Sequence, residues 1–472
     1  MTAWREKTAG RHARCFLSNL DISMTGSPIV AALSLLAALS AQTHDAIPVK
    51  YAAIANRIIA AAQADSAGAW SRIAELTDRF GHRLSGSPAL EQAISWAADA
   101  MIEDGLDTVR REPVPHWVRG AESLTLVSPR RQLLPMLGLG GSIATPPAGI
   151  TAEVFVVSSF EELTKRASEA KGKIVLYDAE WRDYGYNGAF RRLGAIAAAK
   201  AGAAASPAHS AGPYGMRTRH AGNMSYDSTV KRIPHASVTA EDAMMMRRMI
   251  NRGEKVRVTL KMSARMLLDA QSFNVMGELR GREKPEEVVV MGGHIDSWDV
   301  GQGAMDDAGG VVVAWEAIRL LKKLGLTPRR TIRVVGWTNE ENGGRGGAGY
   351  RDGHKSETHQ LAIESDGGVF SPLGFGFTGS PAARALVVAI GGLLSPIGAG
   401  KIEASGGGAD IGPIMATGVP GMGLNVDGTR YFRFHHTDAD TPDELDRAEV
   451  QRCVAMAVMA YIVADLEHGL PR

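Results

Sequence analysis

The sequence is poor in the features that mark specialised classes of protein. Its 472 residues include only two cysteines, Cys15 and Cys453, and carry a formal net charge of +1. Two cysteines cannot supply a disulfide framework. A balanced charge with no basic run beyond the N-terminus gives no sign of a nucleic-acid or anionic-membrane partner. The 45% hydrophobic and 22% charged content is that of a globular protein, and the length predicts two domains or one domain with a large insertion.

Long apolar runs are also scarce. The run "PIVAALSLLAALSA" at 28–41 follows a basic segment and is too short to cross a bilayer comfortably, but it suits the apolar core of a signal peptide. We predict that residues 1–42 are a signal peptide and that the protein is exported, to the periplasm or the medium, with no stable membrane insertion after its removal. A buried apolar helix is the alternative interpretation.

Three different patterns of apolar residues follow one another along the rest of the chain. Residues 46–111 have apolar residues at three- and four-residue spacing, which predicts helices. Residues 119–265 alternate short apolar segments with turns around one alanine-rich helix, which predicts a small β-rich module inserted in a larger domain. From 272 onward, continuous apolar strands alternate with helices. We therefore predict an α/β fold, with a mostly parallel central sheet flanked by helices, built from 43–118 and 266–472.

Polar clusters stand directly after the predicted strands of this domain. "EEVVVMGGH" leads to His294 and Asp296, and the next loop contains Asp306 and Asp307. In the same way, the later strands are followed by these residues: Glu340 and Glu341, then Asp366, then His435 and His436. Because ligands of open α/β sheets bind at the carboxyl ends of strands, we expect these loops to share one crevice.

Imidazoles and carboxylates without cysteine are a donor set that suits zinc or a similar divalent ion. Two cations would also neutralise the crowded carboxylates of "GGHIDSWDVGQGAMDDAGG". Asp296, two residues after His294, is placed to fix the tautomer of that imidazole. Adjacent Glu340 and Glu341 point in different directions, so that one can bind metal and the other a bound water. Singly, each cluster is a weak signal that a polar surface loop or turn would also explain.

As a set, these segments resemble the co-catalytic di-zinc exopeptidases. The resemblance is carried by "GGHIDSWDVGQGAMDDAGG", "WTNEENGGRGGAGY", "ESDGG" and "YFRFHHTDADT". It implies a zinc-exopeptidase fold, and it implies that 119–265 is a protease-associated domain of the kind several members carry. It further implies two Zn²⁺ per chain, bound by these five residues: His294, Asp306, Glu341, Asp366 and His436.

The resemblance also assigns roles within the site. Asp306 would bridge the two ions, Glu340 would be the general base, and Asp296 would orient His294. His436 is preferred to His435 because the H-T-x-x-D-T pattern of the family begins there. The implied reaction is hydrolysis of small unblocked peptides, dipeptides among them, by a water held between the metal ions. The resemblance suggests a homodimer as well.

Two other functions are compatible with the same fold. One is a single-zinc acyltransferase similar to glutaminyl cyclases, and the other is a non-catalytic binding module; the full set of ligands opposes both. For two loops the sequence leaves more than one role possible. The loop with His209 and His220 either reaches the active site or a partner subunit, or serves an ordinary surface or core role. The glycine-rich segment 403–415 either shapes the substrate pocket or only turns the chain.

Overall fold

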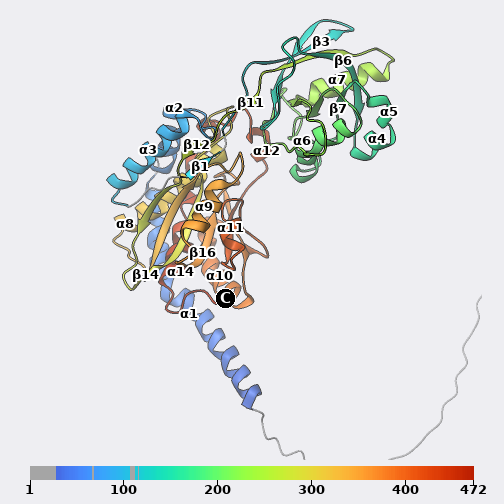
Figure 1. Cartoon of the computed structure of the whole chain (residues 1–472). Helices are drawn as coiled ribbons and strands as arrows, with labels where there is room; N and C mark the ends of the chain where they lie inside the picture. The colour runs from blue at the N-terminus through green and yellow to red at the C-terminus, as the bar shows by residue number, and fades with distance from the viewer. Residues whose placement is uncertain (1–27, 66–67, 107–111, 115) are drawn as a thin grey trace, which may run out of the picture. The chain divides into compact units, whose positions relative to one another are not determined.

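The computed structural model describes residues 28–65, 68–106, 112–114 and 116–472 (Figure 1). The basic segment of the predicted signal peptide lies outside these residues. Residues 44–472 form one compact unit that contains two separate large sheets. In the described part of the chain, no helix is both long and apolar enough to cross a membrane.

The first large sheet has seven strands and is mixed, with the order β13-β15-β14-β16-β19-β17-β18. Four of its six pairings are parallel, and β13 with β15 and β17 with β19 are antiparallel. The strands are β13 (Val275–Leu279), β14 (Lys284–His294), β15 (Arg330–Trp337), β16 (Thr358–Glu364), β17 (Pro372–Thr378), β18 (Lys401–Glu403) and β19 (Gly421–Val426). The α/β fold is confirmed, although β17 and β18 were not predicted.

Both faces of this sheet are buried, which is why β14 reads as a continuous apolar run. Val289 and Met291 join the main core, whereas Val288 and Val290 join a second cluster on the opposite face. This alternation is the two-residue period of a strand. The helices of this part of the chain are α1 (Pro28–Ala64), α2 (Gly68–Phe80), α3 (Pro88–Glu103), α8 (Gly309–Lys323), α9 (Arg345–Gly353), α10 (Pro381–Gly392), α11 (Gly412–Met415), α12 (Tyr431–Phe434), α13 (Arg447–Cys453) and α14 (Met456–Asp465).

The helix starts follow local chemistry. Ser87 caps α3 by accepting a hydrogen bond from the Leu90 amide at 3.3 Å, and Pro88 stands at the first helical position. The apolar stretch near the C-terminus forms two helices, α13 and α14. Helices α8 and α14 both pack against β14 and β15.

The second large sheet lies wholly within 119–265, which we call the inserted segment. Its eight strands have the order β4-β3-β10-β6-β7-β8-β9-β5. They are β3 (Glu122–Ser128), β4 (Gln132–Leu134), β5 (Met136–Gly138), β6 (Ile150–Val157), β7 (Ile174–Tyr177), β8 (Ser206–His209), β9 (His235–Val238) and β10 (Arg257–Met262). Val154 and Val156 face the cluster that contains Met246 of α7 (Ala240–Asn251), and Phe155 and Val157 face the cluster around α6 (Tyr184–Lys200). The segment therefore has cores of its own on both faces of its sheet.

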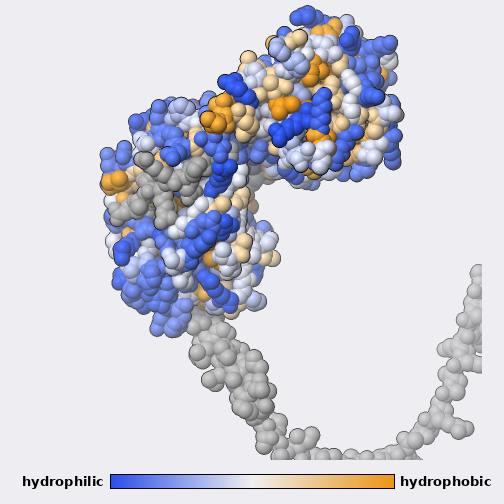
Figure 2. Space-filling view, in the orientation of Figure 1, coloured by the Kyte–Doolittle hydropathy of each residue, from blue (hydrophilic) through white to orange (hydrophobic). Residues whose placement is uncertain are grey.

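Short elements complete the chain. Helices α4 (Phe160–Lys165) and α5 (Ala167–Ala170) follow β6, and two-stranded ribbons pair β1 (Glu112–Val114) with β12 (Ala270–Ser272) and β2 (Trp117–Val118) with β11 (Arg265–Met266). On the face drawn in Figure 2, hydrophilic residues predominate and apolar residues form small separate groups. That the inserted segment is a protease-associated domain stays a prediction.

Candidate active site

Most of the predicted site residues stand at the carboxyl ends of three neighbouring strands. His294 is the last residue of β14, Glu340 and Glu341 follow β15, and Asp366 follows β16. The sheet order β15-β14-β16 makes these strands adjacent, and both pairings are parallel. Their carboxyl ends therefore meet at one edge of the sheet. The structure brings together residues that lie up to 72 positions apart in the sequence.

Asp306 lies at the centre of the group, in an irregular turn (η1, Ala304–Ala308) before α8. Its Oδ1 is 3.1 Å from Nε2 of His294, and its Oδ2 is 3.0 Å from Nε2 of His436. On the outer sides, Asp366 Oδ1 is 3.4 Å from Nε2 of His294 and Glu341 Oε2 is 3.1 Å from Nε2 of His436. One carboxylate thus faces two imidazoles, each of which faces a second carboxylate.

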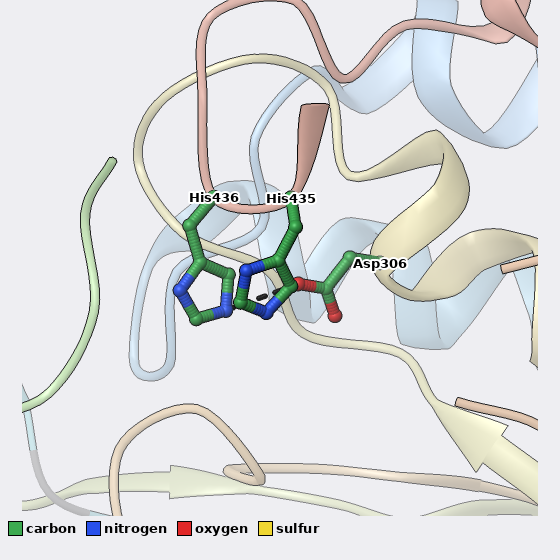
Figure 3. A group of neighbouring side chains, drawn as sticks. All are labelled: Asp306, His435 and His436. Atoms are coloured by element: carbon green, nitrogen blue, oxygen red, sulfur yellow. Dashed lines mark ion pairs between the residues drawn. The ribbon is translucent and has the colours of Figure 1, made fainter. Parts of the chain in front are cut away.

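His435 and His436 both face Asp306, as Figure 3 shows. Their rings stack with centroids 3.6 Å apart, and Nε2 of His435 is 3.4 Å from Asp306 Oδ2. Only His436 also lies within ion-pair distance of Glu341. His436 has a left-handed backbone, with φ of 61°, which turns its ring toward both carboxylates. The geometry therefore favours His436 as the ligand and leaves His435 as its stacking partner.

Asp296 is buried, and its carboxylate is hydrogen-bonded to the Glu340 amide rather than to the His294 ring. Nδ1 of His294 lies 2.9 Å from the backbone carbonyl of Asp296 and 3.8 Å from its carboxylate, beyond hydrogen-bond distance. The carboxylate accepts from the Glu340 amide at 3.1 Å and from the Ser85 hydroxyl at 2.8 Å. Asp296 thus positions His294 through its main chain and Glu340 through its side chain.

Burial and crowding shift the titration of this group strongly. Burial raises the pKa of Glu341 to about 7 and that of Glu340 well above its usual range. The nearby imidazoles oppose this shift, and the neighbouring carboxylates add to it. Burial also acts to raise the pKa of Asp306, but His436 and His294 outweigh it and hold that pKa well below its usual range. A bare site would therefore hold protons on some of its carboxyl groups.

The donor set fits divalent metal ions. Three overlapping groups of described residues bring their ligand atoms within 4.8 Å of one another, and they consist of Asp306 with His435 and His436, of His294 with Asp307 and Asp366, and of His294 with Asp306 and Glu341. Oε1 of Glu341 is buried and accepts no hydrogen bond. An unpaired buried carboxylate oxygen is costly unless a cation faces it. Imidazole nitrogen and carboxylate oxygen are both donors that zinc accepts.

Sequence reasoning assigned no role to Asp307, but in the structure its carboxylate accepts hydrogen bonds from the backbone beside the site. Its carboxylate accepts from the His294 amide at 3.0 Å and from the Gly310 amide at 2.9 Å. A Cβ atom on Gly293 would lie 2.1 Å from this carboxylate, and one on Gly310 would lie 2.5 Å from it. The glycines on either side of the site therefore leave the space that Asp307 occupies.

Two further supporting residues were missed by sequence reasoning. Asp440 is buried and accepts three amides of the turn that holds Asp306, those of Ala304 (3.0 Å), Met305 (2.7 Å) and Asp306 (3.2 Å). Arg83 is fully buried, and its guanidinium donates to backbone carbonyls between Ile295 and Gly303. The position of Asp440 in the H-T-x-x-D-T pattern was the only available signal for it.

A cavity of about 450 Å³ opens onto the site. Its walls come from both large parts of the chain: Tyr184, Arg191 and Asn223 from the inserted segment, and Asp306, Glu340, Glu341, Gly343, Asp366, Tyr431, Phe432, His435 and His436 from the rest. His220 reaches this region, since its Nε2 lies 3.0 Å from the carbonyl oxygen of Phe432. His209 does not line this cavity. The 403–415 segment contributes the Ile411 amide, which donates to Glu364 at 2.8 Å, and no cavity wall.

The fold and the site together define a metallo-exopeptidase, and comparisons with known proteins support this. The chain belongs to peptidase family M28, whose model matches residues 274–461. It is 48% identical over 408 residues to carboxypeptidase Q of Xenopus laevis, covering 85% of this chain and 87% of that protein. The identity to carboxypeptidase Q of Homo sapiens is 47%, covering 85% and 86%.

A solved structure agrees with these relatives. The peptidase M28 precursor from Shewanella amazonensis SB2B is 33% identical to the chain. The two structures superpose with a TM-score of 0.85, and the match covers 89% of this chain and 98% of that one. The resemblance to the exopeptidase family is thereby confirmed. Neither the cyclase nor the binding-module alternative agrees with these relatives.

Proposed function

We propose that the protein is a zinc-dependent exopeptidase that hydrolyses short unblocked peptides, dipeptides among them. The single observation that carries this proposal is the placement of Asp306 between the imidazoles of His294 and His436, with one carboxylate on the outer side of each. Asp306 would be shared by two zinc ions. His294 and Asp366 would complete one site, and His436 and Glu341 the other.

Two zinc ions in these positions would lower the pKa of a water molecule and polarise the scissile carbonyl. The remaining chemistry belongs to the side chains. Glu340 lines the cavity, is not a member of either ligand set, and follows β15 beside Glu341. Its carboxylate takes the proton of the attacking water and delivers it to the leaving amine. Burial raises the pKa of Glu340, which favours its holding the proton between the two transfers.

Asp296 acts on Glu340 through the main chain. One oxygen of its carboxylate accepts a hydrogen bond from the Glu340 amide, and the other accepts one from the Ser85 hydroxyl. A base must stay within hydrogen-bond reach of its proton, so fixing the backbone at Glu340 restricts where its side chain can go.

The predictions on layout and location accompany this function as proposals. They are a signal peptide at 1–42, export, a peptidase domain formed by 43–118 and 266–472, a protease-associated domain at 119–265, and a homodimer. N-terminal sequencing of the protein purified from its native host would test the first, since a mature start near residue 43 is expected and an intact Met1 would contradict it.

The function itself is tested by amino-acid release from a panel of free dipeptides with zinc-loaded and metal-stripped protein side by side. Release that depends on zinc, and that returns when zinc is restored, is the expected result. Folded, zinc-loaded protein that releases nothing from any peptide of the panel would contradict the proposal.

A further inference from the structure

The inserted segment contains a second cavity, separate from the one that opens onto the candidate metal site. Its volume is about 330 Å³, within the range of roughly 300–1,000 Å³ that small-molecule sites occupy. Its walls are formed by Asp178, Ala179, Glu180, Trp181, His209, Tyr214, Met244 and Arg247. None of these residues lines the catalytic cavity. The second cavity is therefore not part of the site described above.

The fold places this cavity at the carboxyl edge of the second large sheet. Asp178 directly follows β7, and His209 is the last residue of β8. Met244 and Arg247 lie on α7, which follows β9. The pairings of β7 with β8 and of β8 with β9 are parallel. Because ligands of open α/β sheets bind at this edge, the cavity stands where a binding site is expected.

His209 brings an unsatisfied polar group to the wall of this cavity. The residue is 9% exposed, and Nδ1 of its ring is buried with no hydrogen-bond partner among the described residues. Burial lowers the pKa of His209 below its ordinary value, although Asp178 and Glu241 oppose the shift, so the ring is neutral near pH 7. A neutral imidazole has one donor and one acceptor nitrogen. Because a buried polar group without a partner is costly, a ligand that forms a hydrogen bond with this ring would be favoured.

The charges around the cavity indicate that the ligand is neutral. Arg247 donates from Nε to the carboxylate of Asp178, and from Nη2 to the backbone carbonyl of Asp178 at 2.9 Å. These two charged groups therefore compensate each other. Glu180 is exposed, and its negative charge opposes an anionic ligand.

Aromatic and thioether groups make up much of the remaining wall. Trp181 is packed against Phe432, with ring centroids 5.8 Å apart, and Tyr214 is 74% exposed on the loop after β8. Aromatic faces and the sulfur of Met244 make favourable contacts with an aromatic ring. A phenol combines such a ring with a hydroxyl that can either donate or accept a hydrogen bond, so it suits either tautomer of His209.

We propose that this cavity binds the side chain of a tyrosine residue in a peptide, with the phenol hydroxyl hydrogen-bonded to His209 and the ring against Trp181. Trp181 also contacts Phe432, which lines the catalytic cavity, so a peptide held here lies beside that cavity. The inserted segment is then a second place of contact for tyrosine-containing peptides. This inference does not depend on which peptides are cleaved at the metal site.

The test measures binding of N-acetyl-tyrosinamide to the zinc-loaded protein by NMR titration. This compound is neutral and both of its ends are blocked, and N-acetyl-phenylalaninamide differs from it only by lacking the hydroxyl. Wild type should bind the tyrosine compound about tenfold more tightly, because the hydroxyl satisfies a buried polar group. In His209→Leu this preference should fall to within about twofold of unity.

A second pair of variants locates the bound compound. Tyr214→Ala changes an exposed side chain of the cavity wall, so it provides the test even if His209→Leu does not fold. It should weaken the binding of both compounds several-fold, because part of the aromatic wall is lost. Met216→Ala is the matched control, since Met216 stands two residues later, is 90% exposed and does not line the cavity. It should bind both compounds as wild type does.

Several results would overturn the assignment. They are equal affinity of wild type for the two compounds, an unchanged preference in His209→Leu, and binding to Tyr214→Ala that equals binding to wild type. Binding that is weakened by Glu340→Gln but not by Tyr214→Ala would place the compound in the catalytic cavity instead. None of these results affects the proposed peptidase function, which zinc-dependent release of amino acids tests separately.

Discussion

At the scale of single residues, the site depends on which carboxylates face a cation and which do not. Asp306 is shared by two imidazoles, whereas Glu340 has its backbone amide fixed by Asp296 and its carboxylate in the wall of the cavity. In the proposed mechanism the neighbouring residues Glu340 and Glu341 therefore have separate tasks. If that mechanism holds, the proton-transfer group can be changed without removing a metal ligand.

Replacement of Glu340 by Gln tests that separation. Glutamine keeps the size of the side chain but cannot accept the proton, so kcat should fall by about two to four orders of magnitude. Zinc content, measured by elemental analysis of the purified variant, should equal that of wild type. Near-normal turnover would rule out Glu340 as the base, and loss of zinc would show that it binds metal.

At the scale of elements, most residues of the site stand at strand ends or in the turn η1. The turn η1 has a non-helical backbone at Asp306, where φ and ψ are −128° and 82°, and the Asp440 carboxylate accepts hydrogen bonds from its amides. The backbone of Asp306 is thus held by a residue 134 positions later in the chain.

Asp440→Asn should loosen this turn. The asparagine NH₂ group would face a backbone amide that needs an acceptor, which we expect to cost about 1–3 kcal/mol of unfolding free energy and to weaken zinc binding. Urea unfolding and a zinc titration measure the two effects. Asp443→Asn, at an exposed position nearby, is the control. If the Asp440 variant is as stable as this control, Asp440 does not support the turn η1.

The inserted sheet contains a histidine that makes its stability depend on pH. Burial lowers the pKa of His235 in β9 to about 4, although its hydrogen bonds to backbone carbonyls oppose the shift. In the unfolded chain the group titrates near 6.5. Its contribution to stability is therefore lost as pH falls from about 6.5 to about 4, because the unfolded state binds the proton first.

The difference in unfolding free energy between wild type and His235→Gln isolates this effect. Between pH 7 and pH 4, wild type should lose about 3 kcal/mol more than the variant. Urea unfolding at the two pH values measures the difference, with the exposed His82→Gln as the control. An equal loss in all three proteins would mean that His235 is accessible to protons in the fold.

The elements that could be predicted from the sequence are those whose pattern is local. "EEVVV" before "MGGH" predicts a buried strand that ends at His294, and the structure has β14 ending at that residue. By contrast, "PLGFGFT" contains proline and two glycines and resembles a loop, yet antiparallel pairing with β19 makes it strand β17. Long-range pairing determined that element, and no local signal reports it.

The same distinction explains the site. The proposed ligands follow predicted strands, so their meeting at one edge of the sheet could be predicted from the topology. Asp440 and Arg191 could not be found in this way, because their partners are distant in the sequence and lie on other elements. In the alanine-rich pattern of α6 nothing indicates which of its arginines, Arg191 or Arg192, is buried.

At the scale of the whole molecule, the metal ions are expected to contribute to folding as well as to catalysis. Without them, the folded chain must keep several carboxyl groups together in a buried place, and burial raises the pKa of Glu341, Glu364 and Asp440 to about 7. A cation that binds only the folded state stabilises it by mass action.

Removal of zinc with a chelator should therefore lower the melting temperature, and added zinc should restore it. At a free zinc concentration one hundred times the dissociation constant, each site would contribute about 2.7 kcal/mol. Differential scanning calorimetry across a zinc titration measures this gain. Asp306→Asn should lose most of it, and a variant that responds to zinc as wild type does would contradict the shared-ligand role.

The contacts between the inserted segment and the loop that contains His436 and Asp438 have a consequence for protein engineering. The Ala221 amide donates to the carbonyl oxygen of His436 at 2.8 Å, and Arg219 pairs with Asp438. A graft that exchanged 119–265 for the corresponding segment of a relative would replace Tyr184, Arg191 and Asn223 in the wall of the cavity and leave the residues of the candidate metal site unchanged. Such a chimaera must also preserve the register between 219–221 and 436–438, because the junction between the two parents would run through the backbone of His436, a residue of that site.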